Sequence, residues 1–228
     1  CRDWRHGTAC NHRRNGRMRS LSSGEAPTGD RQDWKRSVHL RPMRITGGVY
    51  SGRRLHTPKS SQIRPMRDQV RSALFNILRD LVEGSRFLDL FAGTGSVGIE
   101  ALSRGAEHVT FVDKSREAIS ILSENIAELG AEDATTIIRA DVFNWLENES
   151  SSGSAFDLIF VGPPYYHNLA HETLKLLGQA RLSAPEAVIF AEVFKKEQLE
   201  SQYGWLSQID ERLYGDNKIH FYQAGEST

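Results

Sequence analysis

The stretch that most constrains the fold is Phe87–Gly98, with the sequence FLDLFAGTGSVG. An apolar run of strand length leads into three glycines, and the residues after them indicate the first turn of a helix. Gly93, Gly95 and Gly98 can take backbone angles and close approaches that a side chain would block. The following helix would present free N–H groups and its positive dipole end to the loop. We therefore expect a ligand with acceptor atoms on this loop.

Two classes of ligand fit the loop. The spacing Gly93-x-Gly95-x-x-Gly98 matches the dinucleotide fingerprint, and Asp113 follows Gly93 by 20 residues, where an acid that binds ribose is expected. Asp89, at the end of the strand, would repel a pyrophosphate but attract an ammonium and a sulfonium. S-adenosylmethionine carries both cations, so we favour it over NAD. A tight turn that binds no ligand is the third interpretation.

Positive charge is concentrated at the start of the chain. The 228 residues have no net charge, but residues 1–44 contain ten Arg and one Lys against four acids. Residues 1–41 hold few aliphatic side chains, so we expect a flexible leader. Its composition resembles part of an organelle transit peptide, and we expect a chloroplast location, with a mitochondrion or a bacterial cytoplasm as alternatives. A basic tail or an arm that contacts RNA is equally compatible.

Several classes of protein are disfavoured. Both cysteines, Cys1 and Cys10, lie in the leader, so we expect no disulfide framework and no thiolate chemistry in the body, and a reducing compartment. No apolar run approaches the ~18 residues that a membrane span needs. We expect neither a metal nor a membrane partner.

Apolar segments of strand and helix length alternate through the body. After a β-hairpin around residues 44–58, the pattern predicts helices over 64–83, 115–129, 142–146, 168–177 and 195–200 and strands over 87–90, 109–112, 136–138, 156–161 and 187–193. A C-terminal hairpin follows over 205–213 and 218–223. We predict an α/β, Rossmann-like, mostly parallel seven-stranded sheet with this antiparallel hairpin. Residues 42–84 would form a small N-terminal hairpin-and-helix extension, and residues 85–228 the core domain.

Three acids follow the ends of predicted strands. Ligands bind at the carboxyl ends of strands in open α/β sheets, which places Asp89, Asp113 and Asp141 at one edge. Asp113 would bind the two ribose hydroxyls, and Asp141 would accept from an adenine amino group. Each acid alone could instead cap a helix, as Asp141 would for the helix after it.

A second informative stretch is Gly162-Pro163-Pro164-Tyr165, at the end of another predicted strand. The prolines fix the backbone and leave carbonyl groups that can accept from an exocyclic amine. Tyr165 offers a ring on which a flipped or unpaired base can stack. The alternative is a rigid loop with a partly buried Tyr.

The body of the chain resembles the class I S-adenosylmethionine-dependent methyltransferases and, more closely, the RsmD-type 16S rRNA guanine-N2 methyltransferases. The resemblance covers residues 43–224 and rests on MRITGGVYSGRRL (43–55), RPMRDQVRSALFNIL (64–78), LDLFAGTGSVGIEALSRGA (88–106), VDKS (112–115), PPY (163–165) and YGDNKIHFY (214–222). It implies methylation of N2 of a guanine in small-subunit rRNA, as free RNA or in an assembling subunit. We expect a monomer.

The resemblance also implies roles for individual residues. The cofactor-binding set is Asp89, Phe91, Gly93, Gly95, Asp113, Lys114, Asp141 and Val142. The set at the target base is Gly162, Pro163, Pro164 and Tyr165.

Two positions depart from the family pattern. Gly162 stands where the family has Asp or Asn, whose side chain accepts a hydrogen bond from the target amine, and Met66 stands where it has Thr. With Gly162, main-chain carbonyls remain as acceptors. The alternative function is therefore a non-catalytic RNA-binding or ribosome-assembly factor on a methyltransferase fold.

Basic residues gather before the core and suit contacts with RNA phosphates. This predicted RNA-binding set is Arg44, Arg53, Arg54, Arg64, Arg67 and Arg71. An ordinary solvated face is the other interpretation.

Overall fold

The computed structural model describes residues 43–58, 66–149, 155–165, 167–180 and 182–225. These residues belong to one compact unit, residues 41–228. The predicted leader and Arg64 lie outside the described residues, so the expectations for them stay predictions.

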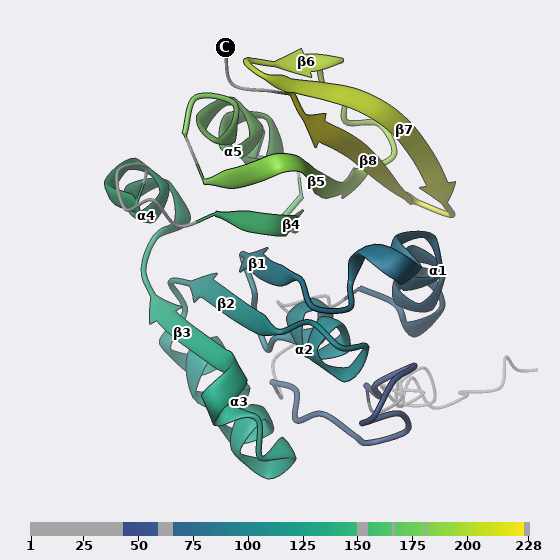
Figure 1. Ribbon diagram of the computed structural model, residues 1–228, viewed down its shortest axis with the longest axis vertical. Coiled ribbons are helices and arrows are strands. Elements are labelled where there is room, and N and C mark those ends of the chain that lie inside the picture. The colour runs from purple at the N-terminus through teal and green to yellow at the C-terminus, as the bar shows by residue number, and fades with distance from the viewer. Residues whose placement is uncertain (1–42, 59–65, 150–154, 166, 181, 226–228) are drawn as a thin grey trace, which may run out of the picture. The chain divides into compact units, whose positions relative to one another are not determined.

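The described part of the chain forms an eight-stranded sheet in the order β3-β2-β1-β4-β5-β8-β7-β6 (Figure 1). Strands β1 to β5 are parallel to one another, and β8 pairs antiparallel with β5 and β7. The strand bounds are β1 Arg86–Leu90, β2 His108–Asp113, β3 Thr135–Arg139, β4 Phe156–Val161, β5 Ser183–Phe194, β6 Gln202–Tyr203, β7 Leu206–Tyr214 and β8 Asn217–Ala224. The predicted class is confirmed, with one strand more than the seven expected because β6 pairs with β7.

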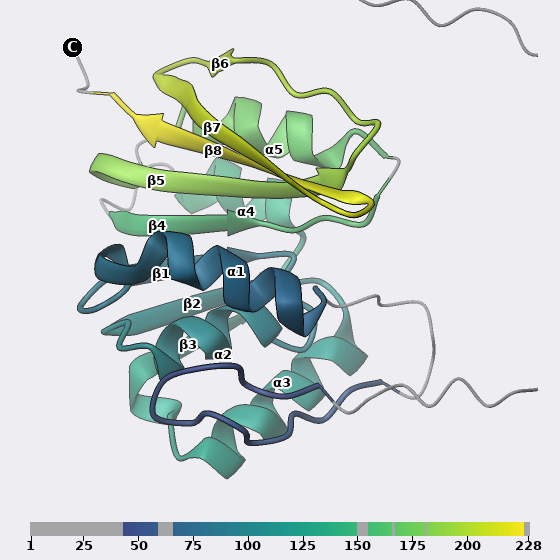
Figure 2. The ribbon, with the colours of Figure 1, turned by 90° about the vertical axis from the view of Figure 1, so that its right-hand side faces the viewer.

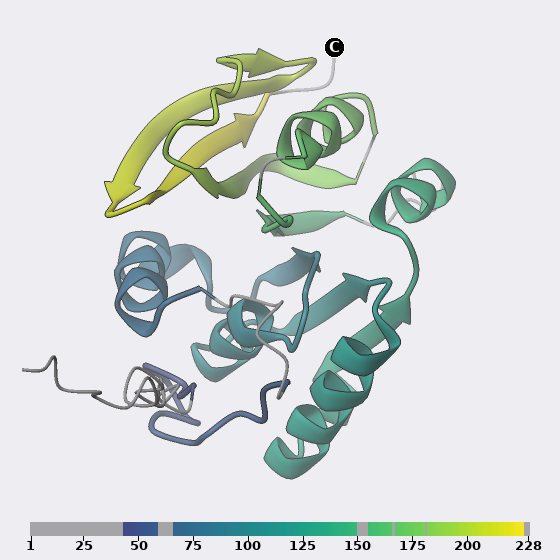
Figure 3. The ribbon, with the colours of Figure 1, turned by 180° about the vertical axis from the view of Figure 1, so that it is seen from behind.

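Helices cover both faces of the sheet, which explains why the central strands are apolar on both sides. The α-helices are α1 Asp68–Leu78, α2 Ser96–Ser103, α3 Arg116–Leu129, α4 Val142–Glu149 and α5 Leu169–Leu177, and the 3-10 turns are η1 Arg79–Leu81 and η2 Glu132–Ala134. Side chains of α1, α2 and α3 share one hydrophobic cluster, and those of α4 and α5 share another. The views from opposite sides show α1 and α2 across the sheet from α4 and α5 (Figures 1 and 3).

The segment 43–58 lies on the face covered by α1, α2 and α3 (Figure 2). The β-hairpin expected here is reduced to a single antiparallel bridge between Arg44 and Arg54. Its arms are joined by the Ile45 N–H, which donates to the Arg53 carbonyl, and the Leu55 N–H, which donates to the Met43 carbonyl, each at 3.0 Å. The backbone of the segment also bonds to the helices beneath it, since Val49 N–H donates to the Ser103 carbonyl at 2.7 Å and His56 N–H to Asn125 Oδ1 at 2.7 Å. The segment is therefore a strap over α2 and α3.

Two predicted helices differ from the structure. The helix predicted over 64–83 is α-helical only over Asp68–Leu78, and two of its apolar positions, Ile77 and Leu81, are exposed. The helix predicted over 195–200 is absent, and this described segment is a turn followed by irregular chain. The Lys195 N–H instead donates to the Asp216 carbonyl at 2.8 Å, which joins the start of this segment to the turn of the C-terminal hairpin.

A buried ion pair fastens the strap and α1 to α2. Arg71 Nε lies 3.1 Å from Glu100 Oε2, and both side chains are 0% exposed. Thr46 donates to Glu100 through its N–H at 2.8 Å and its hydroxyl at 2.7 Å. Burial alone would raise the pKa of Glu100, but the hydrogen bonds from Thr46 and Arg104 and the charge of Arg71 hold that pKa below its usual value.

The expectation that Arg71 contacts RNA is wrong. Its guanidinium also donates to the carbonyls of Met66 and Arg44 and to Asp68 Oδ1, the last at 2.9 Å. A fully buried side chain with these partners cannot reach a phosphate. Arg71 is a structural residue, and its partners all lie on the strap, α1 and α2 or just before α1.

We expect Arg71→Ala to lower the free energy of unfolding by about 3–5 kcal/mol, because it leaves the buried carboxylate of Glu100 without its cation. Urea denaturation followed by circular dichroism measures this. The matched control is Arg67→Ala, one turn earlier and exposed, which should change stability by no more than about 0.5 kcal/mol. Equal stabilities of the two variants would contradict the structural role of Arg71.

Candidate functional site

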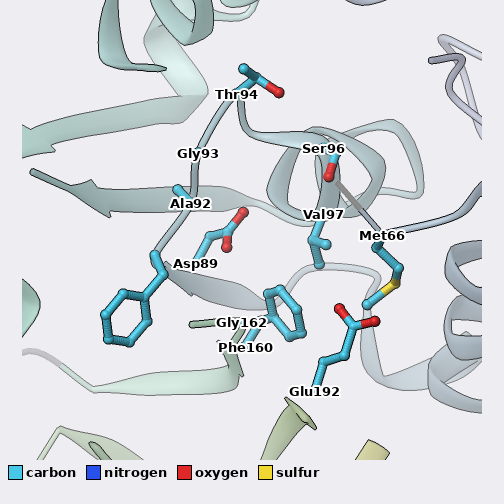
Figure 4. Close-up of a pocket in the computed structure, with 11 residues that line it drawn as sticks. Met66, Asp89, Ala92, Gly93, Thr94, Ser96, Val97, Phe160, Gly162 and Glu192 are labelled. Carbon is cyan, nitrogen blue, oxygen red and sulfur yellow. The ribbon is translucent and has the colours of Figure 1, made fainter. Parts of the chain in front are cut away.

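A pocket in the described residues lies where β1, β4 and β5 end (Figure 4). Asp89 pairs with Phe160 in the register of β1 and β4, and Phe160 pairs with Phe190 in that of β4 and β5. Registered neighbours in parallel strands point to the same face, so these strand ends open toward the α1 and α2 side. The lining residues are Met66, Asp89, Phe91, Ala92, Gly93, Thr94, Ser96, Val97, Phe160, Gly162 and Glu192.

The loop between β1 and α2 forms one wall of the pocket. Phe91, Gly93 and Gly95 all have positive φ, at 60°, 56° and 81°. A Cβ on Gly95 would lie 2.3 Å from the Leu122 side chain, so that position admits glycine alone without a shift of the core. Phe91 is not glycine, and its left-handed conformation costs energy that the surrounding structure must offset. Such backbone strain is typical of functional loops.

Asp89 is the most unusual acid in the pocket. It is 1% exposed, and its Oδ2 accepts from the Gly98 N–H at 2.8 Å. Its Oδ1 is buried without a hydrogen-bond partner in the described part of the chain. Burial raises the pKa of Asp89 to about 7, the Gly98 hydrogen bond opposes this, and the charge of Asp113 adds to it. A buried acceptor without a partner, beside a glycine loop, suits a cationic ligand group.

Asp113 holds the loop from the neighbouring strand. Its Oδ2 accepts from the Gly93 N–H at 2.8 Å and its Oδ1 from the Ser115 N–H at 2.8 Å. Each carboxylate oxygen has a second lone pair, so these bonds leave acceptor capacity for ribose hydroxyls. Asp113 therefore fixes the loop whether or not it also binds the ligand.

Asp141 caps a helix, as one interpretation of the sequence predicted. Its Oδ1 accepts from the Phe143 N–H at 3.1 Å at the start of α4, and its Oδ2 lies 3.4 Å from Lys114 Nζ. Val142 is 2% exposed and packs in the core. Phe143 makes an edge-to-face contact with Phe91, with ring centroids 6.2 Å apart. These residues continue the carboxyl edge beside the pocket, and their predicted contacts with adenine stay predictions.

The Gly162-Pro163-Pro164-Tyr165 stretch begins at the pocket. Gly162 lines it and donates from its N–H to the Leu90 carbonyl at 3.3 Å. Pro163 is buried and Pro164 exposed, and the Tyr165 hydroxyl donates to Glu192 Oε1 at 3.4 Å. The stretch thus lies at the end of β4, next to the glycine loop.

The Phe160 ring fills the space beside Gly162. A Cβ built at Gly162 would lie 2.6 Å from a ring carbon of Phe160, although Gly162 is not among the glycines with positive φ. An Asp or Asn at this position would therefore require the ring to turn away. The ring is held by Phe190, with centroids 5.3 Å apart.

Apart from Ala92, Thr94, Ser96 and Val97 of the glycine-loop stretch, sequence reasoning did not assign Met66, Phe160 and Glu192 to the site, although they line the pocket. Glu192 is 6% exposed, and its Oε1 accepts from Asn217 Nδ2 at 2.5 Å. Burial raises the pKa of Glu192, and the hydrogen bonds from Asn217 and Tyr165 oppose that effect. The available signal was one acid inside the apolar run VIFAEVF.

The structure brings only part of the predicted site together. Asp89, Phe91, Gly93 and Gly162 line one pocket, whereas Gly95 lies in the loop behind it and contacts Leu122 in α3. Asp113, Lys114 and Asp141 lie further along the edge.

Four of the predicted RNA-binding arginines are exposed: Arg44, Arg53, Arg54 and Arg67. Arg53 Nη2 also donates to the Glu128 carbonyl at 2.6 Å, which attaches the strap to the end of α3. Arg67 follows Met66 of the pocket. Their contact with RNA stays a prediction.

The described part of the chain contains no group of three or more His, Cys, Asp or Glu side chains placed to hold a metal ion. Within the same residues, no helix has the length and apolar character needed to cross a bilayer.

Comparison with solved structures agrees with this architecture. A putative methyltransferase, yhhF, from Escherichia coli superposes with a TM-score of 0.72 at 31% identity, covering 81% of this chain and 98% of that one. A putative methylase from Haemophilus influenzae gives 0.67 at 30% identity, covering 81% and 99%. An RNA methyltransferase from Salinibacter ruber in complex with S-adenosylhomocysteine shares the fold, with a TM-score of 0.57 at 13% identity over 72% and 96% of the two chains.

Sequence comparison identifies the family. The family model described as "Conserved hypothetical protein 95" matches residues 43–223. Ribosomal RNA small subunit methyltransferase D of Escherichia coli is 34% identical over 188 residues, 81% of this chain and 93% of that protein. Putative rRNA methyltransferase YlbH of Bacillus subtilis is 32% identical over 181 residues, 79% and 98%. The chain therefore belongs to the RsmD-type family of class I methyltransferases.

Proposed function

We propose that this protein transfers a methyl group from S-adenosylmethionine to N2 of a guanine in small-subunit rRNA. One observation carries the proposal: a buried carboxylate oxygen without a partner, on Asp89, shares a pocket with Gly162 at the start of the Pro-Pro-Tyr stretch. The names of the relatives, which are rRNA small subunit methyltransferases, support the class of substrate.

The acids of the pocket and of the sheet edge beside it fit the cofactor. Asp89 Oδ1 would accept from the ammonium group, Asp113 from the ribose hydroxyls and Asp141 from the adenine amine. When bound, S-adenosylmethionine supplies a methyl group on a positively charged sulfur. The chain supplies position, because the loop between β1 and α2 is already held by Asp89 and Asp113 through the N–H groups of Gly98 and Gly93.

The target base would enter at the end of β4. The carbonyls of Gly162 and Pro163 would accept from the exocyclic amine, and Tyr165 would stack against the base. A guanine amine is a poor nucleophile, so correct positioning contributes most of the acceleration that we propose.

A second candidate function is RNA binding or subunit assembly without methyl transfer. Gly162 favours it, because this position lacks the usual side-chain acceptor and the Phe160 ring occupies the space beside it. In that case wild type would bind RNA without turnover. Gly162→Asn combined with Phe160→Leu, which makes room for the new side chain, would then gain activity.

The first prediction is transfer of label from S-adenosylmethionine to small-subunit RNA or particles that lack the modification. We expect a methylated guanine N2 with wild type, and at least a hundredfold lower rate with Asp89→Ala, because the cofactor loses its anchor. Mass spectrometry of nuclease fragments maps the product. Label on another atom would refute the proposed specificity for guanine N2. If no small-subunit RNA is labelled, the proposal that the protein is an rRNA methyltransferase is wrong.

The second prediction concerns pH. Below pH 7 Asp89 is increasingly protonated and loses its attraction for an ammonium, so the Kd for S-adenosylmethionine should rise by up to about tenfold per pH unit as pH falls. Calorimetric titrations between pH 5.5 and 8.5 measure this. In Asp89→Asn the slope should vanish. A wild-type affinity that does not change with pH would contradict the assignment.

The stability of the protein without ligand should depend on pH in the opposite direction to its affinity for S-adenosylmethionine: it should fall as pH rises. The unfolded chain gives up the Asp89 proton near pH 4 and the folded chain near pH 7, so wild type loses stability relative to Asp89→Asn as pH rises across this window. The difference should be constant above the window. Urea denaturation at pH 4, 5.5, 7 and 8.5 tests the sign.

The third prediction concerns RNA affinity. If Arg53, Arg54 and Arg67 each neutralise a phosphate, replacing all three by Ala should flatten the plot of log K against log salt by about 2 units. The matched control is Arg79→Ala, an exposed arginine at the far end of α1. Affinity for S-adenosylmethionine should stay unchanged in both. If the triple variant keeps the wild-type slope, these three arginines do not contact RNA phosphates.

A further inference from the structure

Glu192 lies beside Gly162 at the edge of the sheet. In the parallel register of β4 and β5, Phe160 pairs with Phe190 and Val161 with Ala191. One more step of that register places Glu192 next to Gly162. Both residues line the pocket that contains Asp89, and the close-up shows the Glu192 carboxylate in it, next to the Phe160 ring (Figure 4).

The carboxylate of Glu192 is held by one oxygen. Asn217 Nδ2 donates to Oε1 at 2.5 Å, and the Tyr165 hydroxyl donates to the same oxygen at 3.4 Å. Both hydrogen bonds of this side chain to described residues therefore go to Oε1. Oε2 makes no hydrogen bond to a described residue, on a side chain that lines the pocket.

Packing alone does not explain this acid. Glu192 is 6% exposed, and no ion pair joins it to a Lys, Arg or His of the described residues. A buried carboxylate without a cation is costly, and its pKa is raised by burial. Acids of this kind in pockets are typical of sites that bind or react with a ligand.

We propose that Glu192 Oε2 accepts the hydrogen bond of the target amine, in place of the side chain that Gly162 lacks. The inference rests on the proposed function and assigns its missing acceptor. The amine nitrogen gains the methyl carbon as the carbon–sulfur bond breaks, and the electron pair of that bond stays on sulfur. One N–H proton leaves the nitrogen for Oε2 and passes from there to solvent, so charge and atoms balance.

The contacts of Glu192 extend this assignment to the base. Tyr165, which would stack on the base, donates to the same carboxylate. Asn217 fixes the carboxylate from β8, where the C-terminal hairpin turns. Glu192 therefore links the stacking ring, the hairpin and the pocket, and the base and its acceptor would be positioned together.

The test is Glu192→Gln, which keeps the size of the side chain and removes its charge and basicity. Single-turnover methylation at saturating RNA and S-adenosylmethionine should slow by about 10²–10³. The Kd for S-adenosylmethionine and the melting temperature should stay near wild type. The matched control is Glu211→Gln, an exposed acid on β7, which should keep the wild-type rate.

A binding measurement separates an acceptor from a structural residue. In RNA whose mapped target guanine is replaced by hypoxanthine, the exocyclic amine is absent. Wild type should bind guanine RNA about tenfold or more tightly than hypoxanthine RNA, because a hydrogen bond to a charged group is lost. In Glu192→Gln the charge-assisted part of this preference is lost, so it should shrink severalfold, which a merely structural role would not produce.

The outcomes separate this inference from the proposed function. If wild type methylates guanine N2 and Glu192→Gln keeps both the rate and the preference for guanine, the inference fails and the function stands. If wild type methylates no small-subunit RNA, both fail. If Glu192→Gln does not fold, Glu192→Asp is tested in its place. It keeps the charge but shortens the side chain by one methylene, so its carboxylate should not reach the amine. A wild-type rate in Glu192→Asp would overturn the inference.

Discussion

Two carboxylates that accept from backbone N–H groups hold the loop on which the site depends. Asp89 accepts from Gly98 and Asp113 from Gly93, each at 2.8 Å. These bonds fix a turn that includes three positive φ angles, one of them at Phe91. They also define the chemistry, because burying Asp89 to hold α2 leaves its other oxygen without a partner. The positive φ angles of the turn and the unpaired Oδ1 of Asp89 therefore both follow from the way these two carboxylates hold the loop, within the described residues.

The parallel register then brings the second half of the site to the first. Asp89, Phe160 and Phe190 are aligned across β1, β4 and β5. Gly162 and Glu192 follow Phe160 and Phe190 by two positions, on the same face of the sheet, and both line the pocket. Gly162, which has no side chain, therefore lies next to the buried acid Glu192 at the end of the neighbouring strand. In our account Glu192, on the neighbouring strand, provides the acceptor that Gly162 lacks.

Local patterns predicted much of this molecule, because glycine spacing, apolar runs and acids at strand ends act over short distances. The sheet, its helices and the loop acids follow from them. Arg71 was misassigned since its partner, Glu100, is 29 residues away and charge alone does not reveal burial. The hairpin predicted over 44–58 is present as a single bridge, but its attachment to α2 and α3 was not predicted, because those hydrogen bonds join residues far apart in the sequence. Glu192 was missed because its importance depends on the register with Gly162.

The most direct test of the account is a crystal structure of this protein with S-adenosylhomocysteine. We predict that the amino nitrogen of the ligand lies within about 3.2 Å of Asp89 Oδ1. The sulfur should then point toward the space between Gly162 and Glu192. A ligand bound away from the loop between β1 and α2, or bound there with its amino group far from Asp89, would contradict the account.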